Sequence, residues 1–539
     1  MKKLWVNIGI FFGCFLLLVT SLGAVLIIAP GMELLGLMYI RSTSGSVYAR
    51  EIISDVAQFD HIYIESNNIP VRVEFIQSYS LRVELIDEYN GFAKAGETPT
   101  VNVSHHGDTI VVESNEYEPF IAHSRSDASG LIVKIPMYYT NNIMVVSQKS
   151  DVHFCGQTAS VNDIVVNTGG DILFSNDLSM HSLNLNLKNN DAIISNSVVM
   201  SGHIVAKSKS GDLTVPVGFS GKLDYDSTSG DLFVGGCAGL NFNSKSGKIG
   251  GIGNVLPSIT GDAFINTGGK IEIGHIGGAG IINAGNGKVI IGEDGKEFAS
   301  RLEIFTKLGE IKMRGRFTNV ENKINSKYGD IKIESMSNFC VETIYGDVEV
   351  SKIDTYGKIV TRSGDVDVDE VVGKVEIESK SGDVEIGEAS KVLENAYIVT
   401  KSGDIEVFNA GNGEIQIETK SGDIEFTQDT ACKSKLTINA EKSNVYLSGI
   451  TGETTVSTKG KIFATIHDLN HPVTLTGKNK AVEVHVRKVC YVDLESKKTI
   501  EAAPDLTEKT KTYNNTPETE TEQVLKIRTA RGKISVIKD

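Results

Sequence analysis

Acidic residues recur at regular intervals in this sequence, and carboxylates can bind cations or serve as acid and base catalysts. Between residues 347 and 425, an aspartate follows a glycine in five successive segments, and a second acid comes two residues later in each. If these segments stack in register, neighbouring carboxylates lie about 5 Å apart and repel each other, and a hard cation such as Ca²⁺ relieves that repulsion through oxygen ligands. The two rows are Asp347, Asp365, Asp383, Asp404 and Asp423, and Glu349, Asp367, Glu385, Glu406 and Glu425.

The densest acidic stretch, at residues 365–369, predicts a weak cation ladder that binds Ca²⁺. Its members are Asp365, Asp367, Asp369, Asp383 and Glu385. The alternative, which we favour, is a structural role, because aspartate after glycine accepts hydrogen bonds from turn N–H groups. Nearby bases at Arg362, Lys380, Lys401 and Lys420 also neutralise the row. The glycine-rich nonapeptide that binds calcium in other β-rolls is missing from this stretch.

A glycan-cleaving enzyme is another function for repeated acids, since such enzymes also use β-helices. A glycoside hydrolase needs two carboxylates at a fixed separation in a groove. Here acids occur in every segment and no pair is unique, the histidines are scattered, and no G-x-S-x-G elbow or phosphate loop is present. We therefore predict no enzyme, no catalytic residue and no cofactor apart from the Ca²⁺ described above.

The acids belong to a repeated phrase that organises most of the chain. The sequence Lys-Ser-Gly-Asp-Ile-Glu occurs at 401–406 and again at 420–425. Related phrases, in which glycine is followed by Asp, Glu or Lys and then by an aliphatic residue, occur back to residue 170. Successive glycines of this phrase are 17 to 22 residues apart from Gly211 to Gly422. A period near 19 residues that is sustained over a dozen copies indicates a repeat protein.

Each repeat must position its acids on short strands. Ile405 and Val407 share one face of a strand and Glu406 faces the other way, while Gly403 lies at the turn before it, where a positive φ or a sharp bend suits glycine. One repeat cannot bury its aliphatic face alone, so the coils stack. We predict an all-β fold, a parallel and right-handed β-solenoid over residues 151–496, in which Pro216 and Pro257 are the only prolines before His471.

Other side chains recur with the same period. Tyr328 and Tyr345 precede glycines in consecutive coils, where we expect them to stack on each other rather than on a sugar. Cysteines 58 to 103 residues apart lie at least three coils apart, too far for disulfides or a zinc knuckle. We expect unpaired and mostly buried thiols at Cys155, Cys237, Cys340, Cys432 and Cys490. A structural hydroxyl ladder is expected from Ser210, Ser229, Ser246, Ser363, Ser381, Ser402 and Ser421.

The first 30 residues predict one transmembrane helix. Two lysines precede an uncharged run from Leu4 to Met32, which is long enough to cross a bilayer, and the lysines place the N-terminus in the cytoplasm. A cleaved signal peptide and a lipoprotein modified at Cys14 are the alternatives, but there is no clear cleavage site and the lipobox is poor. We therefore expect a single-pass protein of the cell membrane, with the bulk of the chain outside the cytoplasm.

The remaining segments predict the two ends of the solenoid. Residues 31–55 are expected to form a juxtamembrane segment, and 56–150 a β-rich module that caps the first coil, because exposed strand edges must be covered. Residues 497–523 are polar and carry two prolines, which predicts a disordered excursion. The aliphatic pattern returns at 524–539, which we expect to form a closing coil.

The net charge of the chain and its likeness to a known family restrict the functions to be considered. The formal net charge of −15 argues against nucleic acid as a partner. The strand pairs at 62–85, the strand ending in proline at 131–136 and the following Ser-Gly-Asp ladder together resemble the DUF4097 family, whose members are labelled adhesins. That resemblance covers about residues 55–490, and it implies a β-solenoid on a bacterial cell envelope and carries over no catalytic residues.

We therefore expect a non-enzymatic, membrane-anchored adhesin that binds a cell-surface polysaccharide, a wall polymer or a protein ligand through its repetitive face. The first alternative is an envelope scaffold, or a stress-response partner of another membrane protein, that touches no foreign surface. The second is a glycan-processing enzyme. Loss of an adhesin lowers attachment and spares membrane-stress responses, whereas loss of a scaffold does the reverse.

Overall fold

The fold was analysed in a computed structural model. It describes residues 33–34, 38–94, 100–115, 121–125, 129–175, 177–387, 393, 395–429, 431–487, 491–502, 510–514 and 524–539. The chain divides into two compact units, Met1–Gly236 and Cys237–Asp539. Each unit is a β-solenoid, and in each the coils pair through parallel strands, as expected from the repeat.

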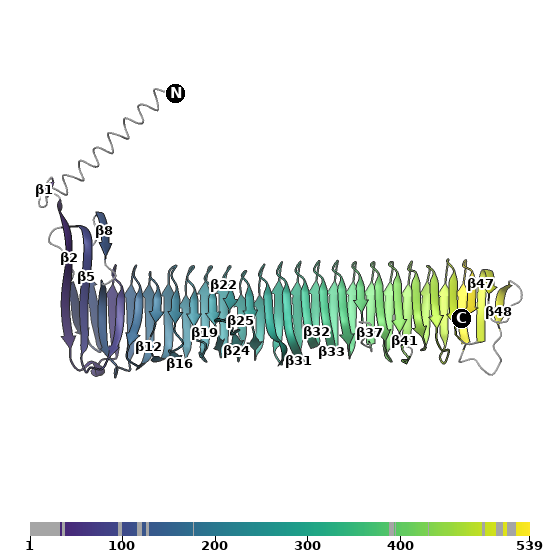
Figure 1. Ribbon diagram of the computed structural model, residues 1–539, viewed down its shortest axis with the longest axis horizontal. Coiled ribbons are helices and arrows are strands. Elements are labelled where there is room, and N and C mark those ends of the chain that lie inside the picture. Colours follow the sequence, from purple (N-terminus) through teal and green to yellow (C-terminus); the bar gives the residue numbers. More distant parts are fainter. Residues whose placement is uncertain are drawn as a thin grey trace, which may run out of the picture. The chain divides into compact units, whose positions relative to one another are not determined.

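Every coil contributes strands to two parallel sheets. The first sheet holds the strand that follows each Gly-Asp turn, and the second sheet holds the strand that precedes the turn. In the first unit, for example, β13 pairs with β15 in the first sheet and β12 with β14 in the second. In the second unit the corresponding pairs are β38 with β40 and β37 with β39. Figure 1 shows the strands of successive coils side by side within each unit.

The strands of the first unit are short and many. They are β1 (Glu33–Leu34), β2 (Met38–Ile53), β3 (His61–Ser66), β4 (Val71–Ile76), β5 (Leu81–Lys94), β6 (Thr100–His106), β7 (Thr109–Asn115), β8 (Ile121–Arg125), β9 (Gly130–Pro136), β10 (Asn142–Ser147), β11 (Val152–Gly156), β12 (Ala159–Thr168), β13 (Ile172–Phe174), β14 (Leu178–Leu187), β15 (Ala192–Ile194), β16 (Val199–Met200), β17 (His203–Lys207), β18 (Leu213–Val215), β19 (Lys222–Ser227) and β20 (Leu232–Val234). One 3₁₀ turn, η1 (Val56–Gln58), precedes β3.

The strands that follow continue the same pattern. They are β21 (Gly236–Cys237), β22 (Gly239–Ser244), β23 (Ile249–Gly250), β24 (Ser258–Ile259), β25 (Ala263–Asn266), β26 (Ile271–Ile273), β27 (His275–Ile276), β28 (Ala279–Asn283), β29 (Val289–Phe298), β30 (Arg301–Thr306), β31 (Ile311–Ser326), β32 (Ile331–Thr343), β33 (Val348–Thr361), β34 (Val366–Val371), β35 (Lys374–Ser379), β36 (Val384–Ile386), β37 (Asn395–Thr400), β38 (Ile405–Ala410), β39 (Glu414–Thr419), β40 (Ile424–Gln428), β41 (Lys435–Ala440), β42 (Val445–Ile450), β43 (Thr454–Thr458), β44 (Ile462–Ile466), β45 (Val473–Gly477), β46 (Val482–Val486), β47 (Tyr491–Ala502), β48 (Thr510–Asn514), β49 (Val524–Thr529) and β50 (Ile534–Lys538). Strands β31, β32 and β33 are long enough to bend and contribute to both sheets.

Alternation of aliphatic and polar residues creates the core. In β38, Ile405 and Val407 are fully buried and Glu406 between them is exposed, as the period of two residues predicts. The same inward position is filled by an aliphatic side chain in each neighbouring coil, so the interior is a continuous stack. In the first unit, Phe154 and Phe174 stack in the same way, with ring centroids 4.5 Å apart and planes within 9°.

The glycine of each Gly-Asp turn is required mainly by close contact between coils. A Cβ atom at Gly364 would overlap the carbonyl group of Gly346 in the preceding coil. The only turn glycines of this series with a positive φ are Gly382, Gly403 and Gly422, so backbone conformation explains only part of the series. A hydroxyl completes the turn: the N–H of Gly364 donates to Thr361 Oγ1 at 3.0 Å. The sequence analysis did not find this role for the Thr or Ser three residues before glycine.

The N-terminal end of the first unit differs from the predicted domain boundaries. Coils begin at β3 and β4 rather than at residue 151, because β3 pairs in parallel with β10 and β4 with β11. The turn between β3 and β4, residues 67–70, is Asn-Asn-Ile-Pro and lacks the Gly-Asp phrase, so the repeat search does not detect this coil. Residues 38–53, expected next to a membrane, form strand β2.

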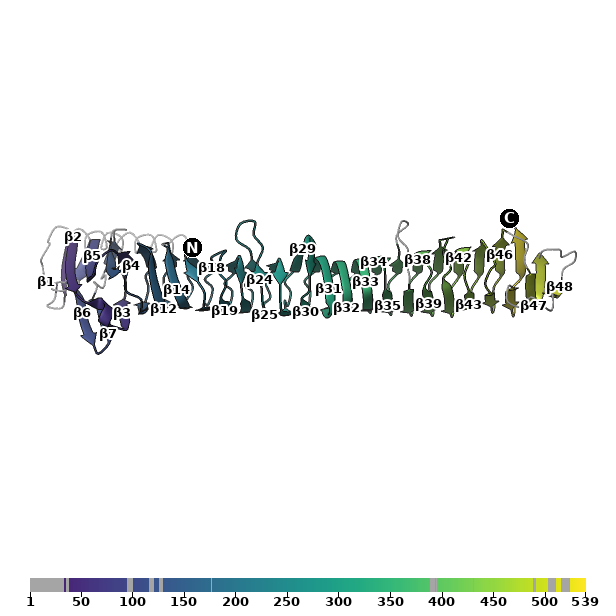
Figure 2. The ribbon, with the colours of Figure 1, turned by 90° about the horizontal axis from the view of Figure 1, so that it is seen from below.

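Antiparallel strands lie at this end of the first unit. β7 and β9 pair in parallel with β3 and β4 on the side away from β10 and β11. β6 then pairs antiparallel with β7, β5 pairs antiparallel with β9, and β2 pairs antiparallel with β5. Figure 2 shows β6 and β7 beside β3. This arrangement supplies hydrogen-bond partners to strand edges of the first coils.

The C-terminal end of the second unit also differs from the prediction. Within segment 497–523, expected to be disordered, residues 497–502 belong to β47 and residues 510–514 form β48, which pairs antiparallel with β47. Ile500 is fully buried, because the aliphatic pattern of β47 continues past the predicted boundary. Residues 524–539 do form a coil, β49 and β50, but it is not the outermost: β49 lies between β45 and β47.

The predicted membrane anchor, residues 1–30, lies outside the described residues. Among the residues that the structure describes, no helix has the length and apolar character needed to cross a membrane.

Replacement of a turn glycine tests the importance of close coil contact. Gly364→Ala should lower the free energy of unfolding of the second unit by about 2–4 kcal/mol, because the added methyl group forces the backbones of two coils apart. Thermal unfolding followed by far-UV circular dichroism measures the effect. Gly218→Ala is the control, since nothing lies within 4 Å of its Cβ position. Equal melting temperatures for the two variants would contradict this explanation.

A histidine links the closing coil to its neighbour and makes that contact depend on pH. His485 in β46 hydrogen-bonds the Asp539 carboxylate at 2.7 Å and the Glu483 carboxylate at 3.1 Å, and these bonds raise its pKa. A raised histidine pKa contributes stability that is complete below about pH 6.5 and is lost as the pH rises through the folded-state pKa. His485→Gln should therefore lower the melting temperature at pH 6 and have little effect at pH 9. A constant difference across this range would show that protonation is irrelevant.

Candidate functional site

The corner aspartates bind the backbone of the next coil. Asp365 N–H donates to Asp347 Oδ1 at 2.9 Å, and Asp383 N–H donates to Asp365 Oδ1 at 2.8 Å. The same bond recurs at Asp404 and Asp423. Each junction also has a bond in the opposite direction, because the N–H of the residue after an aspartate donates to the carbonyl of the next aspartate. The first unit has an equivalent row, formed by Asp151, Asp171, Asp191, Asp212 and Asp231.

The second acidic row lies on the exposed face of the first sheet. Its five members are paired in register from one strand to the next, and all five are exposed. Lys332 neutralises one end of the row through an ion pair with Glu349 of 2.7 Å. Partial burial, then the like charges of Glu385 and Glu425, raise the pKa of Glu406 in the middle. The members are Glu349, Asp367, Glu385, Glu406 and Glu425.

The structure places the five carboxylates of the predicted cation ladder in different positions. Asp365 and Asp383 lie in the corner row and already accept N–H groups. Asp367 and Glu385 are register partners on the exposed face, and Asp369 is half-buried farther along β34. Among the described residues, no group of three or more His, Cys, Asp or Glu side chains lies close enough together to hold a metal ion. The hydrogen bonds of the corner row therefore relate these acids to coil stacking.

The other repeated side chains also contact neighbouring coils. Tyr328 and Tyr345 stack with ring centroids 5.1 Å apart and planes within 6°, as predicted, and the Lys327 ammonium lies 5.1 Å from the centre of the Tyr328 ring. In the serine ladder, Ser402 Oγ donates to the carbonyl of Lys380 and Ser421 Oγ donates to that of Lys401, both at 3.2 Å. These hydroxyls are therefore structural.

The described cysteines are not in disulfides, as predicted. Cys155 and Cys237 are buried, whereas Cys340 and Cys432 are half-buried, and Cys490 lies outside the described residues. Burial raises the pKa of the Cys237 thiol to about 12. The thiol therefore stays protonated at neutral pH, which makes it unreactive.

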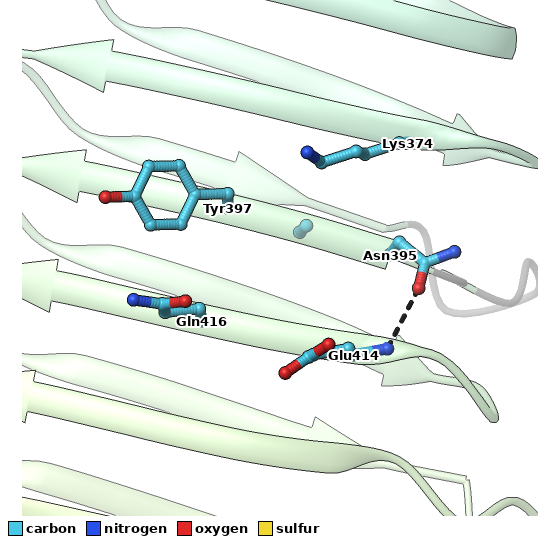
Figure 3. A pocket seen from close by; sticks show the side chains of 6 residues that line it. Lys374, Asn395, Tyr397, Glu414 and Gln416 are labelled. Carbon is cyan, nitrogen blue, oxygen red and sulfur yellow. Dashed lines mark hydrogen bonds between the residues drawn. The ribbon is translucent and has the colours of Figure 1, made fainter.

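A hollow on the second sheet of the second unit is a candidate site that sequence reasoning missed. It has a volume of about 340 Å³ and lies over three adjacent strands, β35, β37 and β39 (Figure 3). The half-buried ring of Tyr397 lies beside Gln416 of the neighbouring strand β39, and Lys374 on β35 lies farther along, opposite Asn395. The lining residues are Lys374, Asn395, Ala396, Tyr397, Glu414 and Gln416.

Hydrogen bonds hold the rim of this hollow. Asn395 Oδ1 accepts the N–H of Glu414 at 2.9 Å, and Gln416 Nε2 donates to Glu418 Oε1 at 2.8 Å. At one end, the Lys374 ammonium lies 2.6 Å from Glu376 Oε1, and this ion pair lowers the pKa of Glu376. Within the described part of the chain, the hydroxyl of Tyr397 has no hydrogen-bond partner. The hollow therefore offers an aromatic face and an available hydroxyl among positioned polar groups.

These lining residues are about 20 positions apart in sequence and belong to no motif. Only the register, in which Lys374 pairs with Asn395 and Tyr397 with Gln416, brings them together. The available signal was their position: apart from the buried Ala396, each occupies an outward-facing place in an alternating strand. Aligning the outward positions of successive repeats in the sequence would have identified the residues that line the hollow.

The repeats described above also match a known protein family. The profile of the Toastrack DUF4097 family matches residues 59–250, 268–407 and 388–537, which together cover most of the chain. No curated protein and no solved structure matches the chain.

Neutralising Glu406 and neutralising Glu376, both in the second unit, should change the melting temperature in opposite directions. Glu406→Gln should raise the melting temperature at pH 7 by about 1 °C, because it removes like-charge repulsion. A raised carboxylate pKa means that stability is fully present below the ordinary value of about 4.3 and is lost as the pH rises through the folded-state pKa, so the benefit should vanish at pH 3. Thermal unfolding at both pH values measures it.

Glu376→Gln is the matched control. Because its ion pair with Lys374 lowers the pKa of Glu376, this carboxylate contributes stability above the ordinary pKa and loses it on acidification. The variant should melt at a lower temperature than the parent at pH 7. Shifts of the same sign for both variants would contradict the electrostatic explanation.

Proposed function

The chain belongs to the Toastrack DUF4097 family, and from this premise we propose that it is a non-enzymatic protein of the cell envelope that binds a polymer through the second sheet of its second unit. The hollow around Tyr397 is the observation that carries this proposal. It combines an aromatic ring with polar groups held by the backbone register, as small-molecule and sugar sites do. In this proposal residues 1–30 anchor the chain in the cell membrane, and the ligand is a wall polymer or a surface polysaccharide.

A repetitive scaffold supports polymer binding better than catalysis. Each coil presents the same outward positions, so a ligand that itself repeats can contact several coils with modest affinity at each. The corner aspartates, which resemble catalytic acids in sequence, are engaged with backbone N–H groups. The adhesin role is the specific form of this proposal, in which the bound polymer belongs to another surface.

Binding to isolated wall polymers tests the proposed function. The purified chain should bind intact cells or wall polymers saturably, and Tyr397→Ala should weaken that binding about tenfold, because stacking on the ring is lost. Tyr446→Ala is the matched control, since Tyr446 is an exposed tyrosine of the first sheet. Calcium and chelator arms show whether the acidic row needs a cation. Absence of saturable binding in every arm would overturn the proposal.

An envelope scaffold is the second candidate, and one surface favours it. Leu173 and Ile193 are register partners on β13 and β15 of the first unit, and 38% and 48% of their side chains are exposed. Exposed aliphatic neighbours of this kind are typical of contacts with another protein. Cross-linking in cells to one membrane protein, lost in Ile193→Asp and retained in Tyr397→Ala, would favour the scaffold over polymer binding.

A further inference from the structure

We propose that the hollow around Tyr397 is one end of a longer strip that binds an extended, uncharged, β-linked glycan, with about one sugar over each coil. This inference rests on the proposed polymer-binding function. It adds the chemical class of the ligand and the direction in which the ligand lies, namely from coil to coil across the strands of the second sheet.

Five outward side chains in register form the strip. Tyr397 on β37 pairs with Gln416 on β39, and Gln416 pairs with Thr437 on β41. Thr437 pairs with Thr455 on β43, and Thr455 pairs with Thr474 on β45. All five occupy the same outward position of successive coils, so they form a straight row with a step of about 4.8 Å, the spacing of neighbouring strands.

The hydroxyl groups of this row are available to a ligand. Within the described residues, Thr437, Thr455 and Thr474 have no hydrogen-bond partner. Inward-facing threonines of the same coils are different: Thr400 donates to Thr419 at 2.8 Å, and Thr458 Oγ1 donates to the carbonyl of Ser443 at 2.6 Å. These two inward threonines are therefore engaged within the chain, whereas the three outward threonines of the row are available to a ligand. A parallel rank beside the row, Asn439, Ser457 and Thr476, adds further polar groups.

The absence of charge in the row indicates an uncharged ligand. From Tyr397 to Thr474 the row holds an aromatic, an amide and three hydroxyl side chains, although the chain as a whole carries a formal net charge of −15. Charged side chains flank the row but do not enter it: Glu414 and Lys435, two residues before Gln416 and Thr437, form an ion pair of 3.1 Å. Glu376, paired with Lys374, lies next to Tyr397 on one side, and Lys526 lies next to Thr474 on the other. At the five row positions themselves a charged polymer would find no ion-pair partner, whereas a polyhydroxylated chain finds donors and acceptors at each.

The step of the row matches a β-linked glycan. In such an extended chain each sugar advances by a length close to the coil spacing of about 4.8 Å, so each coil can meet one ring. Successive rings are turned over, so their hydroxyl edges alternate from one side of the row to the other. Tyr397 provides the aromatic face on which the C–H face of one pyranose ring stacks. Gln416 and the three threonines then meet the hydroxyl edges of the following sugars. Five coils therefore define about five sugar positions.

Titration with oligosaccharides of defined length tests the inference. The full chain is titrated calorimetrically with cello- and chito-oligosaccharides of two to six sugars, and with polygalacturonate as an anionic polymer. Affinity should rise with each added sugar and level off at about five, and polygalacturonate should bind at least tenfold more weakly. Equal affinity for the disaccharide and the hexasaccharide would overturn the proposed alignment.

Variants along the row locate the ligand. Tyr397→Ala should weaken hexasaccharide binding about tenfold. Thr455→Glu, which places a charge at the fourth of the five positions of the row, should shorten the length at which affinity levels off to about three sugars. Tyr446→Ala on the first sheet should leave affinity unchanged, and melting curves of all three variants show whether they are folded. Unchanged affinity in folded Thr455→Glu would overturn the strip.

The failures of the two proposals are distinguishable. If polygalacturonate or isolated wall polymer binds saturably while the neutral oligosaccharides do not, the glycan inference fails and polymer binding stands. If no polymer of either kind binds, both fail. If neutral oligosaccharides bind but Tyr397→Ala has no effect, the ligand lies elsewhere and the strip is overturned.

Discussion

Contact between the backbones of successive Gly-Asp turns is the constraint on which each unit depends. Where Gly364 lies over Gly346, there is no room for a Cβ atom, and the Asp365 N–H reaches the Asp347 carboxylate. Since each coil must approach its neighbour this closely, every strand that follows the turn is held in one register. The aliphatic side chains then stack on their counterparts, and the outward side chains form straight rows.

Straight rows have opposite electrostatic consequences on the two sheets of the second unit. On the first sheet they bring Glu385, Glu406 and Glu425 together, and partial burial together with the repulsion between these carboxylates raises the pKa of Glu406. On the second sheet they bring Tyr397 and Gln416 together with outward threonines. A binding surface for a repeating polymer needs equivalent, available groups at equal intervals, and the second sheet provides these without an electrostatic cost.

Both units interrupt simple coil order at one end. In the first unit the chain forms the coil β3–β4, passes outward to β7 and β9, and then returns to β10 on the other side of β3. In the second unit β47 precedes β49 in the chain, yet β49 lies between β45 and β47. In each case an antiparallel partner, β6 or β48, pairs with the outer strand. Ends built in this way leave fewer unpaired strand edges, which otherwise invite association with other chains.

A glycine-anchored period near 19 residues with alternating aliphatic residues was enough to predict the fold class, because such a pattern has few solutions other than a stacked parallel solenoid. The period also predicts that the described cysteines are not in disulfides and that Tyr328 and Tyr345 stack, since both follow from the spacing alone. It did not detect the coil β3–β4, whose turn carries no Gly-Asp phrase, or the continuation of β47 to Ala502. Only the tertiary structure decided which outward residues become neighbours. Tyr397, Gln416 and Thr437 are about 20 residues apart and share no motif, and their register depends on backbone hydrogen bonds between coils of unequal length.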